Sequence, residues 1–347
     1  MSNDDHPREA AQGLVRLTAA AILGVEGLEP SAWERGFLRE ADPWGFILFG
    51  RNVEAPDQLR RLTLALRDLV GREAPVLIDQ EGGRVQRMRP PHWRAYLPAL
   101  DQMRRATDPL RAQWVRNRLI AAELRDVGID VNCAPLADLV EAHTHPVLLN
   151  RLYGGDVPAV VAAARACVEG LLAGGVLPVL KHLPGYGRAR VDSHQELPRV
   201  SEPLEELERR DFAPFRALAD LPLGMTAHVV LNAVDPERPA TTSPEAIRLI
   251  RERIGFQGCL MTDDVGMEAL SGPVRDRASA SIRAGVDLVL QCNGEPSDME
   301  AAVEGAGTLQ GGAEARADRA LALRGGSEPA DIPALAEELA DLVPELA

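Results

Sequence analysis

Residues 176–194 read VLPVLKHLPGYGRARVDSH, which joins an apolar strand to a loop rich in ionisable groups. The apolar run ends at Lys181 and His182, and the Pro-Gly-x-Gly segment that follows lets the backbone turn. In extended backbone, residues two apart point the same way, so the carboxylate of Asp192 can lie beside the imidazole of His194. Taken alone, Asp192 and His194 are equally consistent with a surface loop in which they only cap a turn. With the strand before them, they favour an active site at the carboxyl end of a barrel strand.

Short apolar runs separated by amphipathic segments recur along the whole chain. We expect strands at residues 19–25, 45–49, 75–79, 130–134, 177–182, 224–229, 258–263 and 286–291. We expect helices between them, among them residues 55–70, 110–127, 158–173, 204–219 and 244–254. Eight strands that alternate with helices predict a parallel sheet that closes on itself. The predicted fold class is therefore α/β, a single-domain (β/α)8 TIM barrel with a C-terminal helical extension.

The C-terminal segment differs from the rest of the chain. Glycine pairs at 311–312 and 325–326 separate helical stretches rich in Ala, Glu and Leu that carry no catalytic pattern. We therefore expect a catalytic barrel domain over residues 1–305. Residues 306–347 are expected to form a helical extension packed on the outside of the barrel.

Composition limits the partners and the compartment. The formal net charge of −14 argues against nucleic acid, since binding a phosphate backbone requires basic patches. The four cysteines are widely spaced in apolar surroundings, so we expect reduced core residues and neither disulfides nor a zinc site. We see no signal-peptide core and no apolar run near the roughly 20 residues of a membrane span. We expect a cytoplasmic protein with no membrane partner, and a monomer because no apolar patch or heptad pattern is evident.

Polar residues end several of the predicted strands. Asp79 ends the third strand, Lys181 and His182 end the fifth, and His228 ends the sixth. Arg151 lies between the fourth and fifth strands. Taken singly, such residues are more often structural, for example as a helix cap, a surface charge or a hydrogen-bonded core histidine. Their convergence on one barrel mouth is what favours a functional site.

Asp263 and Asp264 end the seventh strand. Successive strand residues face opposite sides and adjacent ionised carboxylates repel each other, so we expect one of them to face the pocket as nucleophile or base. We expect its neighbour to be tied to the backbone or to an arginine. The pair Lys181-His182 raises the alternative of a Schiff-base aldolase, which requires a neutral lysine. His182 and the nearby carboxylates keep Lys181 charged, which suits the binding of hydroxyl groups or of a carboxylate.

Six segments of the chain resemble those of glycoside hydrolase family 3, in particular its bacterial β-N-acetylhexosaminidase branch. They are residues 45–49 (GFILF), 78–88 (IDQEGGRVQRM), 150–151 (NR), 181–194, 225–228 (MTAH) and 262–267 (TDDVGM). They follow the family order from residue 20 to about 295, which is nearly the whole barrel. The block Lys-His-x-Pro-Gly-x-Gly, followed after four residues by Asp-Ser-His, is highly specific.

The resemblance implies a carbohydrate substrate and a set of site residues. The family's nucleophile falls on Asp263, its general acid/base on His194, and the partner that orients the histidine on Asp192. Sugar-binding positions fall on Asp79, Arg87, Arg151, Lys181 and His182. The resemblance also implies that N-acetylglucosamine is removed from 1,6-anhydromuropeptides (GlcNAc-anhydroMurNAc peptides) during cytoplasmic recycling of the cell wall.

The loop after the fifth strand departs from the family pattern. Leu183 and Tyr186 stand where Phe and then His or Leu are usual, and Arg188 and Arg190 stand where neutral or acidic residues are expected. None of these changes removes a catalytic group. They leave the loop contacts and the preference for the aglycone open.

For the reaction we expect retention of configuration through a glycosyl-enzyme on Asp263, with His194 as acid and then base, oriented by Asp192. A glycoside phosphorylase and another family 3 β-glycosidase are the alternatives within the family. A non-catalytic sugar-binding barrel is the remote alternative. The histidine and acid positions lack ligand spacings such as His-Glu-x-x-His, so we expect no metal and no other cofactor.

Overall fold

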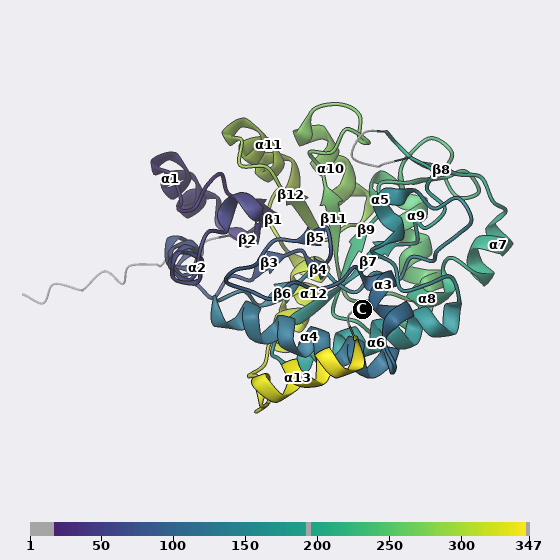
Figure 1. The fold of residues 1–347 in the computed structure, drawn as a ribbon. Coiled ribbons are helices and arrows are strands. Elements are labelled where there is room, and N and C mark those ends of the chain that lie inside the picture. Colours follow the sequence, from purple (N-terminus) through teal and green to yellow (C-terminus); the bar gives the residue numbers. More distant parts are fainter. Residues whose placement is uncertain (1–16, 192–195, 345–347) are drawn as a thin grey trace, which may run out of the picture.

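The computed structural model describes residues 17–191 and 196–344, and it shows a closed barrel of eight strands (Figure 1). The strands are β1 (Ala19–Gly24), β2 (Pro43–Leu48), β3 (Val76–Ile78), β6 (Val131–Asn132), β7 (Leu177–Leu183), β9 (Leu223–Thr226), β11 (Cys259–Asp264) and β12 (Leu288–Gln291). They are hydrogen-bonded in the order β1-β12-β11-β9-β7-β6-β3-β2, and each neighbouring pair is parallel. The predicted (β/α)8 TIM barrel is confirmed, and each of the eight predicted strands is present.

The barrel strands are buried on both sides, which explains their appearance in the sequence. Strands of a parallel sheet covered on both faces lose the alternation of polar and apolar residues and become continuous apolar runs. Every residue of the eight barrel strands is buried except Asp263 and Asp264 at the end of β11. These two aspartates therefore mark the place where the barrel interior opens to solvent.

Helices surround the barrel (Figure 1). They are α1 (Ala32–Ala41), α2 (Pro56–Val70), α3 (Ala99–Arg105), α4 (Pro109–Asp126), α5 (Pro146–Leu149), α6 (Val157–Ala173), α7 (Leu204–Arg209), α8 (Ala213–Ala217), α9 (Pro244–Arg248), α10 (Val274–Ala284), α11 (Pro296–Ala306), α12 (Gly311–Ala322) and α13 (Ile332–Leu342). The helices α2, α4 and α6 match predicted ones. None of the helices within the described ranges has the length and apolar character needed to cross a membrane.

One of the predicted helices is interrupted, and another changes its helix type. The segment 204–219 forms α7 and α8, separated by residues 210–212. Pro214 lies in the first turn of α8, where its missing N–H is tolerated, whereas inside one long helix it would remove a hydrogen bond and clash with the preceding turn. The segment 244–254 is helical throughout, as predicted: α9 continues directly into a π-helical turn, η3 (Leu249–Ile254).

A short hairpin follows β3 at the carboxyl end of the barrel. It pairs β4 (Gln80–Gly82) with β5 (Val85–Gln86) in antiparallel register. Gly82 and Gly83 have φ of 105° and 57°, the left-handed region that favours glycine. A Cβ on Gly82 would also lie 1.9 Å from Nη2 of Arg116. The Gly-Gly pair therefore lets the chain turn back over the barrel mouth.

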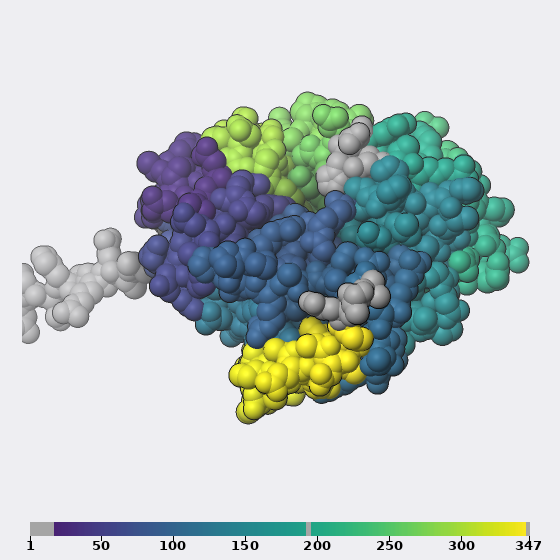
Figure 2. Space-filling model, in the orientation of Figure 1, coloured from purple at the N-terminus to yellow at the C-terminus, as the bar shows by residue number. Residues whose placement is uncertain are grey.

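The C-terminal helices contact two different parts of the barrel. Just before β12, Asp287 pairs with Arg316 of α12 at 2.6 Å, and just before β6, Asp130 pairs with Arg324, which follows α12, at 2.9 Å. These strands lie on opposite sides of the barrel order, so α12 spans its amino-terminal end. The helix α13 packs against α4 at the surface, where it is drawn in yellow (Figure 2). The boundary at residue 305 between barrel and extension stays a prediction.

Candidate active site

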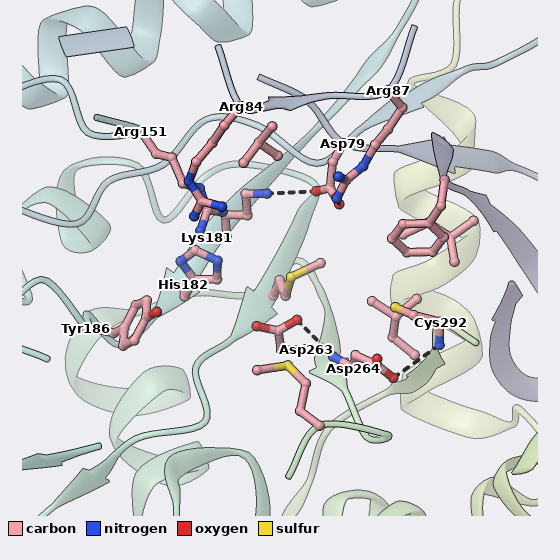
Figure 3. Close-up of a pocket in the computed structure, with 16 residues that line it drawn as sticks. Asp79, Arg84, Arg87, Arg151, Lys181, His182, Tyr186, Asp263, Asp264 and Cys292 are labelled. Carbon is pink, nitrogen blue, oxygen red and sulfur yellow. Dashed lines mark hydrogen bonds and ion pairs between the residues drawn. The ribbon is translucent and has the colours of Figure 1, made fainter. Parts of the chain in front are cut away.

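A cavity of about 320 Å³ lies at the carboxyl ends of the barrel strands (Figure 3). Its polar or ionisable lining residues are Asp79, Arg84, Arg87, Arg151, Lys181, His182, Tyr186, Asp263, Asp264 and Cys292. Its apolar lining residues are Ile47, Phe49, Val85, Met225, Met267 and Leu290. Active sites of TIM-barrel enzymes lie at this end of the barrel, so the cavity is the candidate active site.

Lys181, at the end of β7, binds Asp79, which follows β3. Its Nζ lies 2.9 Å from Oδ1 of Asp79, while Nη2 of Arg87 lies 3.0 Å from Oδ2 of the same carboxylate. Burial would raise the pKa of Asp79, but the positive charges of Lys181 and Arg87 hold it well below its usual value. Burial would lower the pKa of Lys181, but Asp79 and Glu81 raise it above its usual value. The lysine is therefore charged, as predicted, and unsuited to forming a Schiff base.

Glu81, on β4, joins Lys181 to Arg151. Its Oε1 lies 2.6 Å from Nζ of Lys181 and 2.8 Å from Nη2 of Arg151, and its Oε2 accepts from Nε of Arg151 at 2.9 Å. Burial would raise the pKa of Glu81, but Arg151 and Lys181 lower it to about 2. The side chains of Glu81 and Arg151 are 4% and 11% exposed. Arg151 is thus held rigidly beside the cavity by a two-pronged carboxylate contact.

His182 is oriented by Asp138, from the loop after β6. Nδ1 of the imidazole lies 2.8 Å from Oδ2 of Asp138, which also accepts the backbone N–H of His182 at 3.2 Å. Oδ1 of Asp138 accepts the backbone N–H of Tyr186 at 2.7 Å. The ring of Tyr186 packs edge-on against the imidazole, with centroids 5.3 Å apart. The contacts fix the plane of the imidazole at the wall of the cavity.

Asp263 and Asp264 have different environments although they are adjacent. Oδ1 of Asp264 accepts the backbone N–H groups of Gly266 and Cys292 at 2.9 and 3.1 Å, as expected for the carboxylate tied to backbone. Asp263 lies below His182 (Figure 3), and its Oδ1 accepts only the N–H of Asp264, at 2.8 Å, among the described residues. Burial raises the pKa of Asp264. Burial also works against ionisation of Asp263, but His228, His182 and the Asp264 N–H together lower its pKa.

His228 is a buried histidine with both ring nitrogens bonded. Nδ1 lies 2.8 Å from Oγ1 of Thr241, and Nε2 lies 2.8 Å from the backbone oxygen of Asp264. Burial lowers its pKa, with Asp263 opposing the shift. Its bond to the Asp264 backbone supports the end of β11, and it is the hydrogen-bonded core histidine that the sequence favoured for His228 taken alone.

Phe49 forms an apolar wall of the cavity. The guanidinium groups of Arg51 and Arg87 lie 5.0 and 5.3 Å from the centre of its ring, within reach of cation–π attraction. Arg87 therefore bridges this wall and Asp79. The sequence reasoning assigned no such wall.

The residues of the unusual loop have separate roles in the structure. Leu183 is buried within β7, Tyr186 packs on His182, and Arg190 is exposed. Arg188 is an ion-pair centre: its Nε lies 2.9 Å from both oxygens of Asp211, and Glu202 and Glu206 lie 3.3 Å from its other nitrogens.

The structure brings six of the eight predicted site residues to one cavity. They are Asp79, Arg87, Arg151, Lys181, His182 and Asp263. The other two, Asp192 and His194, lie outside the described residues. The sequence reasoning missed Glu81 and Asp138. Glu81 lies two positions after Asp79, on the same side of extended backbone, so an inspection of the residues after the third strand would have found it. Asp138 lies six positions after the end of β6, where no strand-end signal marks it.

Comparison with known proteins agrees with this geometry. Residues 19–322 match the glycosyl hydrolase family 3 N-terminal domain. A beta-hexosaminidase of Alkalilimnicola ehrlichii is 41% identical over 287 residues, which are 80% of this chain and 81% of that protein. NagZ from Neisseria gonorrhoeae, solved in complex with N-trifluoroacetyl-D-glucosamine, superposes with a TM-score of 0.83 at 30% identity and covers 95% of this chain and 99% of its own. A family 3 beta-N-acetylglucosaminidase from Paenibacillus sp. str. FPU-7 gives 0.82 at 30% identity, over 94% of this chain and 67% of its own. The chain belongs to glycosyl hydrolase family 3.

Proposed function

We propose that this protein is a β-N-acetylglucosaminidase that removes terminal β-linked N-acetylglucosamine with retention of configuration. The observation that carries the proposal is the state of Asp263. Its carboxylate lies in the cavity at the end of β11, has a lowered pKa, and makes no ion pair with any described residue. An ionised carboxylate that is held in place without a cationic partner remains available as a nucleophile.

In the proposed first step, an oxygen of Asp263 attacks the anomeric carbon and the bond to the leaving oxygen breaks, which gives a glycosyl-enzyme. The Asp264 N–H binds Oδ1 of Asp263, and within residues 17–191 and 196–344 the second oxygen accepts no hydrogen bond, so it can form the new bond. Oδ1 of Asp264 already accepts the N–H groups of Gly266 and Cys292, so Asp264 is less suited than Asp263 to act as the nucleophile.

We assign acid/base catalysis to His194, with Asp192 orienting its ring, as the family resemblance implies. Protonated His194 would donate its proton to the leaving oxygen, and the neutral ring would then take a proton from the water that releases the sugar. An ordinary imidazole pKa of about 6.5 makes both forms accessible near neutral pH. Retention follows because the anomeric carbon is attacked twice, once by Asp263 and once by water.

The remaining residues of the cavity suit the binding of a sugar. Asp79 and His182 offer acceptors to ring hydroxyls, and Lys181, Arg87 and Arg151 offer charged donors. Their mutual ion pairs hold these groups in place before the sugar arrives, which lowers the cost of ordering them on binding. The names of the relatives, beta-hexosaminidase and beta-N-acetylglucosaminidase, support an N-acetylated hexose as the ligand.

We further propose that the physiological substrates are 1,6-anhydromuropeptides in the cytoplasm, and that no cofactor takes part. This substrate proposal follows from the resemblance of the segments at 78–88 and 181–194 to the wall-recycling branch of the family.

The test is hydrolysis of an aryl N-acetyl-β-glucosaminide by two neighbouring variants. Asp263→Ala should lower kcat by about 10⁴-fold or more, the scale seen when a nucleophilic residue is removed. Asp264→Asn, the matched control, keeps an oxygen for the N–H groups of Gly266 and Cys292 and should stay within about 10-fold of the parent. Release of free sugar both with and without phosphate would separate hydrolysis from phosphorolysis. Turnover by a natively folded Asp263→Ala variant would refute the assignment.

A further inference from the structure

Asp138 is a buried carboxylate that does not line the cavity but binds a residue that does, His182. Its side chain is 0% exposed, and it is absent from the cavity wall. Three nitrogen atoms lie at its two oxygens: the backbone N and Nδ1 of His182 lie at Oδ2, and the backbone N of Tyr186 lies at Oδ1. Asp138 therefore contacts the site through one side chain, the imidazole of His182.

The contact at Nδ1 determines which ring nitrogen of His182 carries the proton. A carboxylate only accepts hydrogen bonds, so Nδ1 must donate. In a neutral imidazole the other nitrogen, Nε2, then has a free lone pair. Nε2 has no hydrogen-bond partner among the described residues, and the ring borders the cavity beside Lys181 (Figure 3).

A second role of Asp138 must be separated from this one. Through the N–H of Tyr186, the carboxylate also ties the loop after β7 to the loop after β6. Thr144 makes a tie of the same kind, because its hydroxyl donates to the backbone oxygen of Gly187 at 2.7 Å. The hydrogen bonds of Thr144 to described residues go to Gly187 and Glu141, not to His182, so it offers a control for loop anchoring alone.

We propose that Asp138 is a positioning residue that holds His182 in the Nδ1–H form, so that Nε2 is presented to a sugar hydroxyl as a hydrogen-bond acceptor. Lys181 presents a donor from the neighbouring position. A hydroxyl group both donates and accepts, so this pair matches one sugar hydroxyl from two directions. The inference rests on the proposed function for its ligand, but the protonation of His182 is a property of the protein without ligand.

The first test is ¹⁵N NMR of the histidine-labelled, substrate-free wild-type protein at pH 8, where an ordinary imidazole is neutral. Comparison with His182→Gln assigns the His182 signals. We expect a protonated Nδ1 and an unprotonated Nε2. A ring protonated at Nε2, alone or together with Nδ1, would overturn the inference while leaving the proposed function untouched.

The second test is a double-mutant cycle on kcat/KM and KM with an aryl N-acetyl-β-glucosaminide. Asp138→Asn has only one acceptor oxygen, so it loses either the N–H of Tyr186 or both groups of His182, Nδ1 and the backbone N–H. It should lower kcat/KM by about 10- to 100-fold, the range observed when the carboxylate behind a metal-bound histidine is removed. In the His182→Gln background, the same change should cost less than about 2-fold, because the group through which Asp138 acts is gone.

Thr144→Val is the matched control for the cycle. It breaks the loop tie to Gly187 and should cost the same small factor with or without His182. If Asp138→Asn also costs the same factor in both backgrounds, Asp138 acts only as a loop anchor and the proposal is wrong. Melting temperatures of all variants identify any loss of fold, and in that case the NMR measurement on the wild-type protein decides.

Discussion

The ammonium nitrogen of Lys181 lies 2.6 Å from Oε1 of Glu81, and both side chains are almost completely buried. Removing one partner of a buried ion pair leaves the other charge uncompensated in a poorly solvating environment. Glu81 also carries the two contacts to Arg151. The ion pair between Lys181 and Glu81 therefore both stabilises the barrel mouth and holds the proposed sugar-binding groups in place.

Glu81→Gln should destabilise the protein by about 3 kcal/mol at pH 7, because Arg151 loses its carboxylate inside the fold. The folded-state pKa of Glu81, about 2, lies below the ordinary value of 4.5, so its contribution is complete above pH 4.5 and is lost as the pH falls towards 2. Urea unfolding of parent and variant at pH 7 and pH 3 measures this. Glu338→Gln, which removes a solvent-exposed salt bridge to Arg111, is the control and should change little. An equal cost of Glu81→Gln at both pH values would contradict the account.

The contribution of Asp211 to the free energy of unfolding should have the opposite pH dependence to that of Glu81. Burial raises its pKa to about 6, although Arg188 opposes the shift. A carboxyl group whose pKa is raised in the folded state binds its proton more tightly there, so its contribution to stability falls as the pH rises from about 4 to 6. The difference in unfolding free energy between parent and Asp211→Asn should therefore be less favourable to the parent at pH 7 than at pH 4.5. A difference that favours the parent more at pH 7 would mean that the ion pair with Arg188 outweighs burial.

Much of the fold was predictable because parallel strands that are buried on both faces appear in the sequence as continuous apolar runs. Polar residues at the carboxyl ends of barrel strands are expected to meet at one mouth, and this correctly placed Asp79, Lys181 and Asp263 in one cavity although they come from three strands. The division of residues 204–219 into α7 and α8 was missed because the amphipathic period continues through the break. Pro214 was the visible signal for it.

The contacts inside the site were less accessible to sequence reasoning. Asp138 and His182 are 44 positions apart, and their contact depends on the register of β6 against β7 and on the course of both following loops. No spacing rule encodes such a pair. The partners of Arg188 were likewise invisible: the sequence marked it as unusual, and the structure places Asp211, Glu202 and Glu206 around it.

The amino-terminal end of the barrel offers a test of how α12 is held. Asp287 is bound by Arg316 and also by Arg251, at 2.7 Å. Arg316→Ala should cost about 1 kcal/mol because Arg251 remains, whereas Arg251→Ala with Arg316→Ala should cost about 3 kcal/mol or more, because buried Asp287 then loses both of its ion-pair partners in the described part of the chain. The value of kcat/KM should stay within about 2-fold, since the cavity is at the other end. Denaturant titrations of Arg316→Ala, Arg251→Ala and the double variant, together with one activity assay, measure these quantities, with Arg283→Ala on α10 as an exposed control. Simple additivity of the two single changes would contradict a shared role for the arginines.

His194→Ala should separate substrates by their leaving groups. An alkyl or sugar leaving group needs a proton, whereas an activated aryl leaving group does not, so the loss should be far larger for the first kind. Steady-state kinetics on a series of leaving groups of different pKa measures this as a steeper dependence in the variant. Equal losses along the series would show that His194 has a structural role only.

The most direct test of the central claim is to trap the covalent intermediate. A 5-fluoro analogue of N-acetylglucosamine with an activated leaving group should form a stable ester, and mass spectrometry should find it on the tryptic peptide 254–275, with fragment ions that place it on Asp263. The variant Asp263→Ala should remain unlabelled. A label on another residue, or a product of inverted anomeric configuration, would contradict the assignment of Asp263 as the nucleophile.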